Sequence, residues 1–365
     1  MSVDQLNIVN FRNLSNTSLN FHPHLNLVLG ENGSGKSSIL EAIFFLAHGK
    51  SFRTTKVENI VSHEHHQLTV NIKDHAVNSL GISKNLSTNI LTIQVNGQRI
   101  NKLSDLAKNI AVQIVTPESF KLFFGGPKER RRFIDLGLFH VKHEFSKKWS
   151  VFNKIHKQRN ACLRKKVTKQ ELAYWTGEFC HYSQIIADDR VEYIAQLQVE
   201  LIKWLDILLP QLTDKIKIHY SQGWSAKKRL SEVLNENYER EKLQCFSIAG
   251  AHKFDVKFTL YKQPLDLVIS RGQQKLFLLA LTFAQAKLIE KVKQVKPILL
   301  IDDIGAELDI NSRKALATAL NSLACQTIVT AINKVDLMPL LEQTIAEKED
   351  NYKMFHVKHG EISIE

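Results

Sequence analysis

The chain has 365 residues, of which 44% are hydrophobic and 24% are charged, so it is long enough for two or three domains of ordinary globular composition. Basic residues exceed acidic ones by 49 − 37 = 12, which favours a polyanionic partner, nucleic acid first. No run approaches the roughly 18 apolar residues of a membrane span, and the N-terminus does not resemble a secretory signal. The four cysteines are not spaced as in a metal site or a disulfide framework. These features exclude a membrane-spanning or disulfide-rich secreted protein, and we expect a cytoplasmic one.

A glycine-rich loop follows the first predicted strands, which lie around residues 6–9 and at residues 25–29. Residues 30–37 fit the pattern G-x-x-x-x-G-K-[ST], and apolar residues at helical spacing follow. The order of strand, loop and helix is typical of a phosphate-binding loop, in which backbone N–H groups and the helix N-terminus hold the anion. Lys36 is expected to meet the β- and γ-phosphates, and Ser37 to ligate Mg²⁺. The predicted nucleotide contacts are Gly30, Glu31, Asn32, Gly33, Ser34, Gly35, Lys36, Ser37 and Ser38.

Two segments could supply the acidic residue that completes the magnesium site. One alternates like a half-buried strand and ends at Asp74; the other, residues 297–303, is a continuous apolar run that ends in Asp302 and Asp303. The second is favoured, because continuous apolar runs are typical of parallel strands covered on both faces. We predict that Asp302 binds magnesium and that Asp303 polarises the attacking water, which makes Asp303 and Lys36 the catalytic residues.

A second helix start lies about thirty residues earlier, at Ser270-Arg-Gly272-Gln273-Gln274. The apolar spacing after it predicts a helix that runs to about Val292. Its first turn could face an anion, although an ordinary capped helix explains the same residues.

Together these motifs resemble the RecF family of bacterial recombinational repair ATPases. Residues 270–274 look like an ABC-type signature, and residues 298–303 and 307–309 look like a Walker B strand and the D-loop after it. Further matching segments are residues 10–12, 40–42, 50–54, 116–118, 126–127 and 130–135, so the resemblance covers nearly the whole chain. It implies an α/β fold: an ABC-type P-loop ATPase head, related to SMC and Rad50 heads, with a small β-rich lobe and an inserted compact helical arm but no long coiled coil.

The resemblance also implies a function. Two subunits would sandwich two ATP molecules with Mg²⁺, and Ser270, Gly272 and Gln273 of one subunit would face the γ-phosphate bound to Lys36 of the other. Arg12 would join the nucleotide site and Asp309 the D-loop. ATP binding would drive formation of the homodimer and DNA binding, and slow, DNA-dependent hydrolysis would reverse both. With RecO and RecR, such a protein would help place RecA on gapped DNA at the nucleoid.

Several positions depart from the family's pattern. Asp303 stands where transporters of the ABC class carry Glu, which suggests slow turnover, and Ala306 replaces the D-loop serine. No histidine follows the strand at residues 327–330, so Thr330 or Asn333 would have to sense the γ-phosphate. The stretch at residues 250–255 also differs, which puts any role for it in doubt.

Three segments are expected along the chain. Residues 1–140 form the N-terminal part of the head, with the β-rich lobe at about 55–110 and a hairpin at Asn96-Gly97; residues 141–245 form the helical arm; and residues 246–365 complete the head. Residues 141–171 carry ten Lys or Arg against two Glu, with Phe145, Trp149 and Phe152 at helical spacing and expected in the core. The basic face is either a surface that follows DNA phosphates, without base-specific contacts, or merely solvated. The candidates for DNA binding are Lys147, Lys148, Lys154, Lys157, Arg159, Arg164, Lys165 and Lys166.

Two other functions remain open. Residues 302–305 have the form D-x-x-G and residues 333–336 the form N-K-x-D, as in GTPases, but the gap of 266 residues from Lys36 to Asp302 exceeds a compact GTPase core, and this hypothesis leaves residues 270–274 unexplained. The other alternative is a DNA clamp whose nucleotide is purely structural. The histidines of residues 63–66 are expected in a polar loop rather than a metal site.

Overall fold

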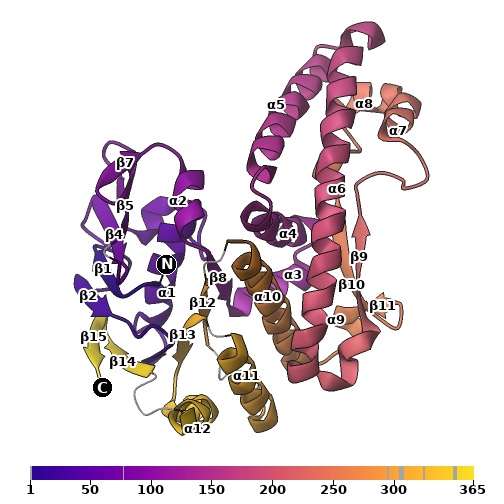
Figure 1. Cartoon of the computed structure of the whole chain (residues 1–365). Helices are drawn as coiled ribbons and strands as arrows, with labels where there is room; N and C mark the ends of the chain where they lie inside the picture. The colour runs from indigo at the N-terminus through magenta and orange to yellow at the C-terminus, as the bar shows by residue number, and fades with distance from the viewer. Residues whose placement is uncertain (1, 77, 294–295, 304–307, 324, 348–351) are drawn as a thin grey trace. The chain divides into compact units, whose positions relative to one another are not determined.

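The computed structural model describes residues 2–76, 78–293, 296–303, 308–323, 325–347 and 352–365 (Figure 1). The chain forms two compact units. The first, here called the head unit, comprises residues 1–119, 204–210 and 271–365; the second, the arm unit, comprises residues 120–203 and 211–270. Within the described ranges, no helix is both long enough and apolar enough to cross a bilayer.

A largely parallel sheet forms the centre of the head unit, with the strand order β15-β14-β3-β13-β12-β8. All neighbours pair in parallel except β14 and β15. Every residue of β3, β12 and β13 is buried, which confirms the covered parallel strand expected at residues 298–301. The strands are β3 (Leu25–Leu29), β8 (Val112–Val115), β12 (Ile298–Ile301), β13 (Gln326–Ala331), β14 (Tyr352–Lys358) and β15 (Glu361–Ile364). The main helices of this unit are α1 (Lys36–His48), α2 (Leu103–Asn109), α10 (Arg271–Lys293), α11 (Ile310–Leu323) and α12 (Met338–Glu347).

The β-rich lobe is a second, antiparallel sheet with the order β2-β1-β4-β5-β6-β7. The predicted turn joins β6 and β7, where Asn96 and Gly97 have φ of 50° and 76°. The lobe is larger than expected, because β1 and β2 from the first twenty residues belong to it, and β2 was not predicted. Apolar side chains of this sheet and of α1 share one core. Its strands are β1 (Gln5–Val9), β2 (Thr17–Asn20), β4 (Gln67–Lys73), β5 (Ser79–Asn85), β6 (Leu91–Val95) and β7 (Gln98–Ile100).

The arm unit is mainly helical and contains a small sheet with the order β11-β10-β9. Phe145 and Phe152 are in the core as expected, whereas Trp149 is half-buried and stacks on both. The helices are α3 (Lys121–Phe124), α4 (Pro127–Val141), α5 (Phe145–Arg164), α6 (Lys169–Leu208, whose last turns belong to the head unit), α7 (Leu230–Glu236), α8 (Tyr238–Gln244) and α9 (Leu265–Val268). The strands are β9 (Ile216–Ser221), β10 (Asp255–Leu260) and β11 (Gln263–Pro264).

The boundaries of the two units differ from those expected. The arm unit begins at residue 120 rather than 141 and extends to residue 270 rather than 245. Ion pairs join the added segments to the arm unit: Arg130 of α4 donates two hydrogen bonds of 2.8 Å to Asp255 of β10, and Asp135 of α4 accepts from Arg190 of α6. These pairs fix α4 and β10 to the arm helices, which no local sequence pattern reveals.

Candidate nucleotide-binding site

The glycine loop connects β3 to α1, which confirms the predicted order of strand, loop and helix. Gly33 and Gly35 have φ of 80° and 119°, a region that residues with a side chain rarely adopt. A Cβ atom at Gly35 would lie 2.9 Å from Cδ2 of Leu14, so Gly35 lacks room for a side chain as well as having a backbone that disfavours one. Because α1 begins directly after Gly35, the N–H groups at its N-terminus point into the loop, where they can hold an anion.

The ammonium of Lys36 is held inside this loop. Its Nζ donates hydrogen bonds to the carbonyl oxygens of Gly30 at 2.6 Å and Glu31 at 2.8 Å. Burial lowers the pKa of Lys36 below its usual value, while the charges of Asp302 and Asp303 act in the opposite direction. The cation therefore lies in the loop, close to both acidic residues.

The two predicted magnesium ligands, Ser37 and Asp302, contact each other, and Thr330 contacts Asp302 as well. Ser37 Oγ donates to Asp302 Oδ1 at 2.9 Å, although 265 residues separate them. Buried Thr330, at the end of β13, donates to the same Asp302 oxygen at 2.7 Å and accepts from the backbone N–H of Asp303 at 2.9 Å. Asp74, the rejected alternative, lies after β4 in the other sheet and accepts from Asn78. The choice of Asp302 is consistent with this geometry.

A cavity of about 430 Å³ opens above these groups. Of the predicted nucleotide contacts, Gly30, Glu31 and Ser34 do not line it. Gly30 and Glu31 hold Lys36, and Ser34 is buried with an Oγ that has no hydrogen-bond partner among the described residues. The lining residues are Arg12, Asn13, Asn32, Gly33, Gly35, Lys36, Ser37, Ser38, Arg53, Pro117, Asp302, Asp303, Thr330 and Ile332.

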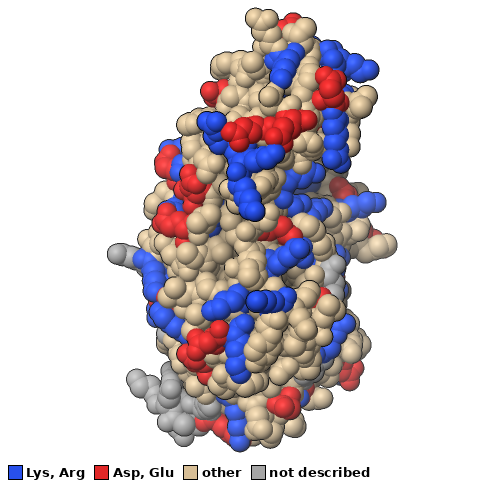
Figure 2. Space-filling view, turned by 90° about the vertical axis from the view of Figure 1, so that its right-hand side faces the viewer, with Lys and Arg blue, Asp and Glu red and all other residues tan. Residues whose placement is uncertain are grey.

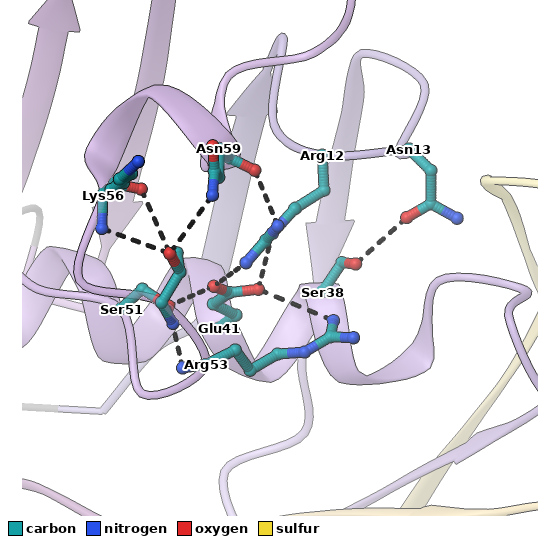
Figure 3. Close-up of polar contacts among 9 residues, drawn as sticks. Arg12, Asn13, Ser38, Glu41, Ser51, Arg53, Lys56 and Asn59 are labelled. Carbon is teal, nitrogen blue, oxygen red and sulfur yellow. Dashed lines mark hydrogen bonds and ion pairs between the residues drawn. The ribbon is translucent and has the colours of Figure 1, made fainter.

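Two arginines meet at the rim of this cavity, around the carboxylate of Glu41 (Figure 3). Glu41 is fully buried in α1; Arg12 donates to its two oxygens at 3.0 and 2.7 Å, and Ser51 also donates to it. Arg53 lies 3.7 Å from the same carboxylate and is about half exposed. The resemblance suggested Arg12; Arg53 was missed as a residue of this site, since only the fold brings the two arginines to one acid.

Of the two GTPase-like motifs, D-x-x-G begins at Asp302 in this cavity, whereas N-K-x-D is not part of it. Among the described lining residues there is none from 333–336, and Asp336 instead pairs with Arg313 at 2.9 Å. Lys334 pairs with Glu365 at 2.8 Å. Gly305 of the D-x-x-G pattern lies outside the described residues.

The signature and D-loop residues occupy helix starts. Arg271 begins α10 directly after Ser270, with Gly272 and Gln273 in the first turn, so the predicted helix start is confirmed. Asp309 precedes α11 and accepts from the N–H of Ser312 at 2.7 Å, a bond that lowers the pKa of Asp309. Ala306 and Glu307 lie outside the described residues.

The basic residues proposed for DNA binding do not behave alike. Arg159 is buried and donates to Glu241, Ser247 and Thr176, so it cannot belong to a surface. Lys147 pairs with Glu144, and Lys148 is half-buried and pairs with Asp189. The face drawn in Figure 2 likewise mixes basic with acidic side chains. The remaining candidates are exposed: Lys154, Lys157, Arg164, Lys165 and Lys166.

No cluster of three or more His, Cys, Asp or Glu suited to a metal occurs within the part of the chain that the structure describes. His63, His65 and His66 are exposed, as expected for a polar loop.

Comparison with known proteins identifies the family. The profile of the RecF/RecN/SMC N terminal domain matches residues 2–363. The DNA replication and repair protein RecF of Colwellia psychrerythraea is 59% identical over 367 residues, covering 99% of this chain and 97% of that protein. The RecF protein of Pseudoalteromonas translucida is 38% identical, covering 99% of both chains.

Solved structures show the same fold. A structure of the recombination mediator protein RecF with ATP, of the RecFOR pathway, matches with a TM-score of 0.84 at 23% identity, covering 100% of this chain and 97% of the other. An Smc head bound to a domain of ScpA matches more weakly, with a TM-score of 0.59 at 16% identity and coverage of 100% and 97%. The fold is therefore the expected ABC-type ATPase head, and the chain belongs to the RecF family.

Proposed function

We propose that this chain is an ATP-dependent DNA-binding protein of recombinational repair and replication restart. The observation that supports this most is the meeting of Lys36, Ser37 and Asp302 in one cavity, because a phosphate-binding lysine, a hydroxyl and a carboxylate from distant segments are what Mg·ATP requires. ATP is favoured over GTP, since Asp336 is paired with Arg313 away from the cavity lining.

The side chains present fit ATP and Mg²⁺. Ser37 Oγ and Asp302 Oδ1 are hard oxygen ligands of the kind that magnesium prefers. Bound magnesium would neutralise charge on the phosphates. Asp303 is the proposed base for the attacking water, and Thr330 is preferred to Asn333 as the γ-phosphate sensor because it lines the cavity and bonds to both acidic residues.

ATP is proposed to act as a dimerisation switch. Ser270, Gly272 and Gln273 at the start of α10 would face the γ-phosphate held by the second subunit, with Asp309 of the D-loop beside them. Relatives named for DNA replication and repair, and one of the RecFOR pathway, support the same role here, with RecO and RecR as partners and RecA loading at single-strand gaps as the outcome. The site of action is the nucleoid in the bacterial cytoplasm.

Sedimentation tests the switch. Wild type and Lys36→Ala are compared with a short gapped duplex, each with and without Mg·ATP, at two salt concentrations. Dimers and salt-sensitive DNA binding should require both ATP and Lys36. Equal DNA binding by monomers of both proteins, with or without ATP, would contradict the proposal.

Asp303→Asn separates a hydrolytic switch from a structural nucleotide. If hydrolysis releases the protein, this variant should form dimers that remain longer on DNA than those of the wild type. An unchanged residence time would instead favour the clamp with a purely structural nucleotide.

The DNA surface is proposed to lie on the exposed residues of α5 and the turn after it. We expect the variant Lys154→Ala/Lys157→Ala/Lys165→Ala/Lys166→Ala to bind DNA more weakly. The slope of log K against the logarithm of the salt concentration should fall in magnitude by about one for each lost phosphate contact. Lys228→Ala is the matched control, since Lys228 already pairs with Glu236 at 2.7 Å. An unchanged salt slope would place the DNA elsewhere.

A further inference from the structure

The backbone of Asp303 has an unusual conformation. Its φ is 54°, in the left-handed region, which costs free energy for a residue with a side chain and persists where neighbouring groups enforce it. Two side chains do so: Thr330 Oγ1 accepts from its N–H at 2.9 Å, and Lys275 Nζ donates to its carbonyl oxygen at 2.7 Å. Both polar backbone groups of the proposed base are thus held by side chains from other elements.

Lys275 is an unexpected residue for its position. Only 4% of its surface is exposed, and it lies in α10 within a run of buried residues from Gln274 to Ala286. A buried ammonium costs free energy that a methionine of similar length would avoid. Packing of α10 therefore does not by itself explain a lysine here, whereas its bond to Asp303 does.

We propose that Lys275 is a positioning residue that couples the signature end of α10 to the proposed base Asp303 of the same subunit. Lys275 stands five residues after Ser270, on the same helix as Gly272 and Gln273, so any movement of this helix start moves the donor that holds the Asp303 carbonyl. This inference rests on the proposed function, in which Ser270 serves the nucleotide of the second subunit. Contact at one site would thereby set the geometry of the acid at the other.

Steady-state hydrolysis with the full chain and DNA tests the role of Lys275. For Lys275→Met we expect about tenfold slower hydrolysis at saturating Mg·ATP, with nucleotide affinity within about twofold of wild type, because the bond acts on the base and not on the phosphates. Lys275→Arg keeps a donor and should recover most of the rate. Lys287→Met is the matched control on the same helix, since Lys287 pairs with Glu290, and it should be unaffected.

Mixed dimers test the coupling. When one subunit carries Lys275→Met and the other is wild type, only the nucleotide site of the first subunit should be slowed, and about half of the wild-type rate should remain. When one subunit carries Ser270→Arg and the other is wild type, the site of the second subunit loses its signature serine and the acid of the first subunit loses its positioning, so less than half of the rate should remain. A Ser270→Arg mixed dimer that kept half of the wild-type rate would overturn the coupling.

Two results for Lys275→Met would contradict the positioning role of Lys275. A rate for Lys275→Met within twofold of wild type, or equal losses of rate and nucleotide affinity, would refute a positioning role. If the methionine variant fails to fold, Lys275→Gln, whose amide is one bond shorter and misses the carbonyl, takes its place with the same expected result. Failure of the proposed function would look different, since wild type itself would then lack ATP-dependent dimers or hydrolysis.

Discussion

Two pairs of arginines, one pair in each unit, differ in burial and in the acid that they contact. In the arm unit, Arg159 and Arg190 are at most 1% exposed and bond to Glu241 and to Asp135. In the head unit, the side chains of Arg12 and Arg53 are 21% and 47% exposed and share the single carboxylate of Glu41 at the cavity rim. Burial with a matched acid marks an arginine that stabilises the fold, whereas exposure beside a cavity with a shared acid marks one available to a ligand. The net charge of the chain does not distinguish these two kinds of arginine.

The largest expected effect comes from breaking the buried pair of the arm unit. Arg159→Met leaves Glu241 as an unpaired carboxylate in the interior, and we expect a loss of about 3–5 kcal/mol in the free energy of unfolding. Urea denaturation of the arm transition measures it. Arg159→Met/Glu241→Leu should recover most of the stability, because it removes both charges; a single variant as stable as wild type would contradict a structural role.

A smaller effect on stability should appear with acid. Burial is the main cause that lowers the pKa of His156 to about 4 and of His252 to about 3, and the two rings lie 4.1 Å apart between centroids. In the folded protein both imidazoles stay neutral, whereas in the unfolded chain they bind protons near pH 6.5. Their contribution to the free energy of unfolding is therefore complete above pH 6.5 and declines as the pH falls towards 4.

Thermal unfolding between pH 6.5 and 5, where most carboxylates remain ionised, measures this dependence. His156→Gln/His252→Gln should have a flatter profile than wild type, since neither glutamine titrates. A profile as steep as that of wild type would show that other groups cause the acid sensitivity.

The smallest effect is expected at the exposed arginine of the head unit. Arg53→Ala should leave the unfolding free energy within about 0.5 kcal/mol of wild type, because exposed ion pairs contribute little. It should weaken Mg·ATP binding about fivefold, equivalent to roughly 1 kcal/mol at a partly exposed cation. Titration with a fluorescent ATP analogue measures this; unchanged affinity together with lost stability would place Arg53 with Arg159 as a structural residue.

Contiguous residues made much of the head predictable. The glycine loop, the helix after it, the buried strand before Asp302 and the start of α10 were all predicted, because phosphate-loop geometry and strand or helix periodicity depend on neighbours in sequence. The hairpin at Asn96-Gly97 follows for the same reason, since its turn needs residues that tolerate positive φ.

Only the tertiary structure decided which side chains meet and which are buried. The count of basic residues placed Arg159 with the exposed lysines of α5, but its ion pair with Glu241, 82 residues away, lies in the interior. Arg53 at the cavity and Lys275 at the Asp303 carbonyl likewise carry no local signal. The sequence by itself determined the motifs and the elements that bear them, because both depend on short-range backbone geometry. The tertiary structure decided the ion pairs, the unit boundaries and the full set of residues at the cavity, because these depend on contacts between segments far apart in the chain.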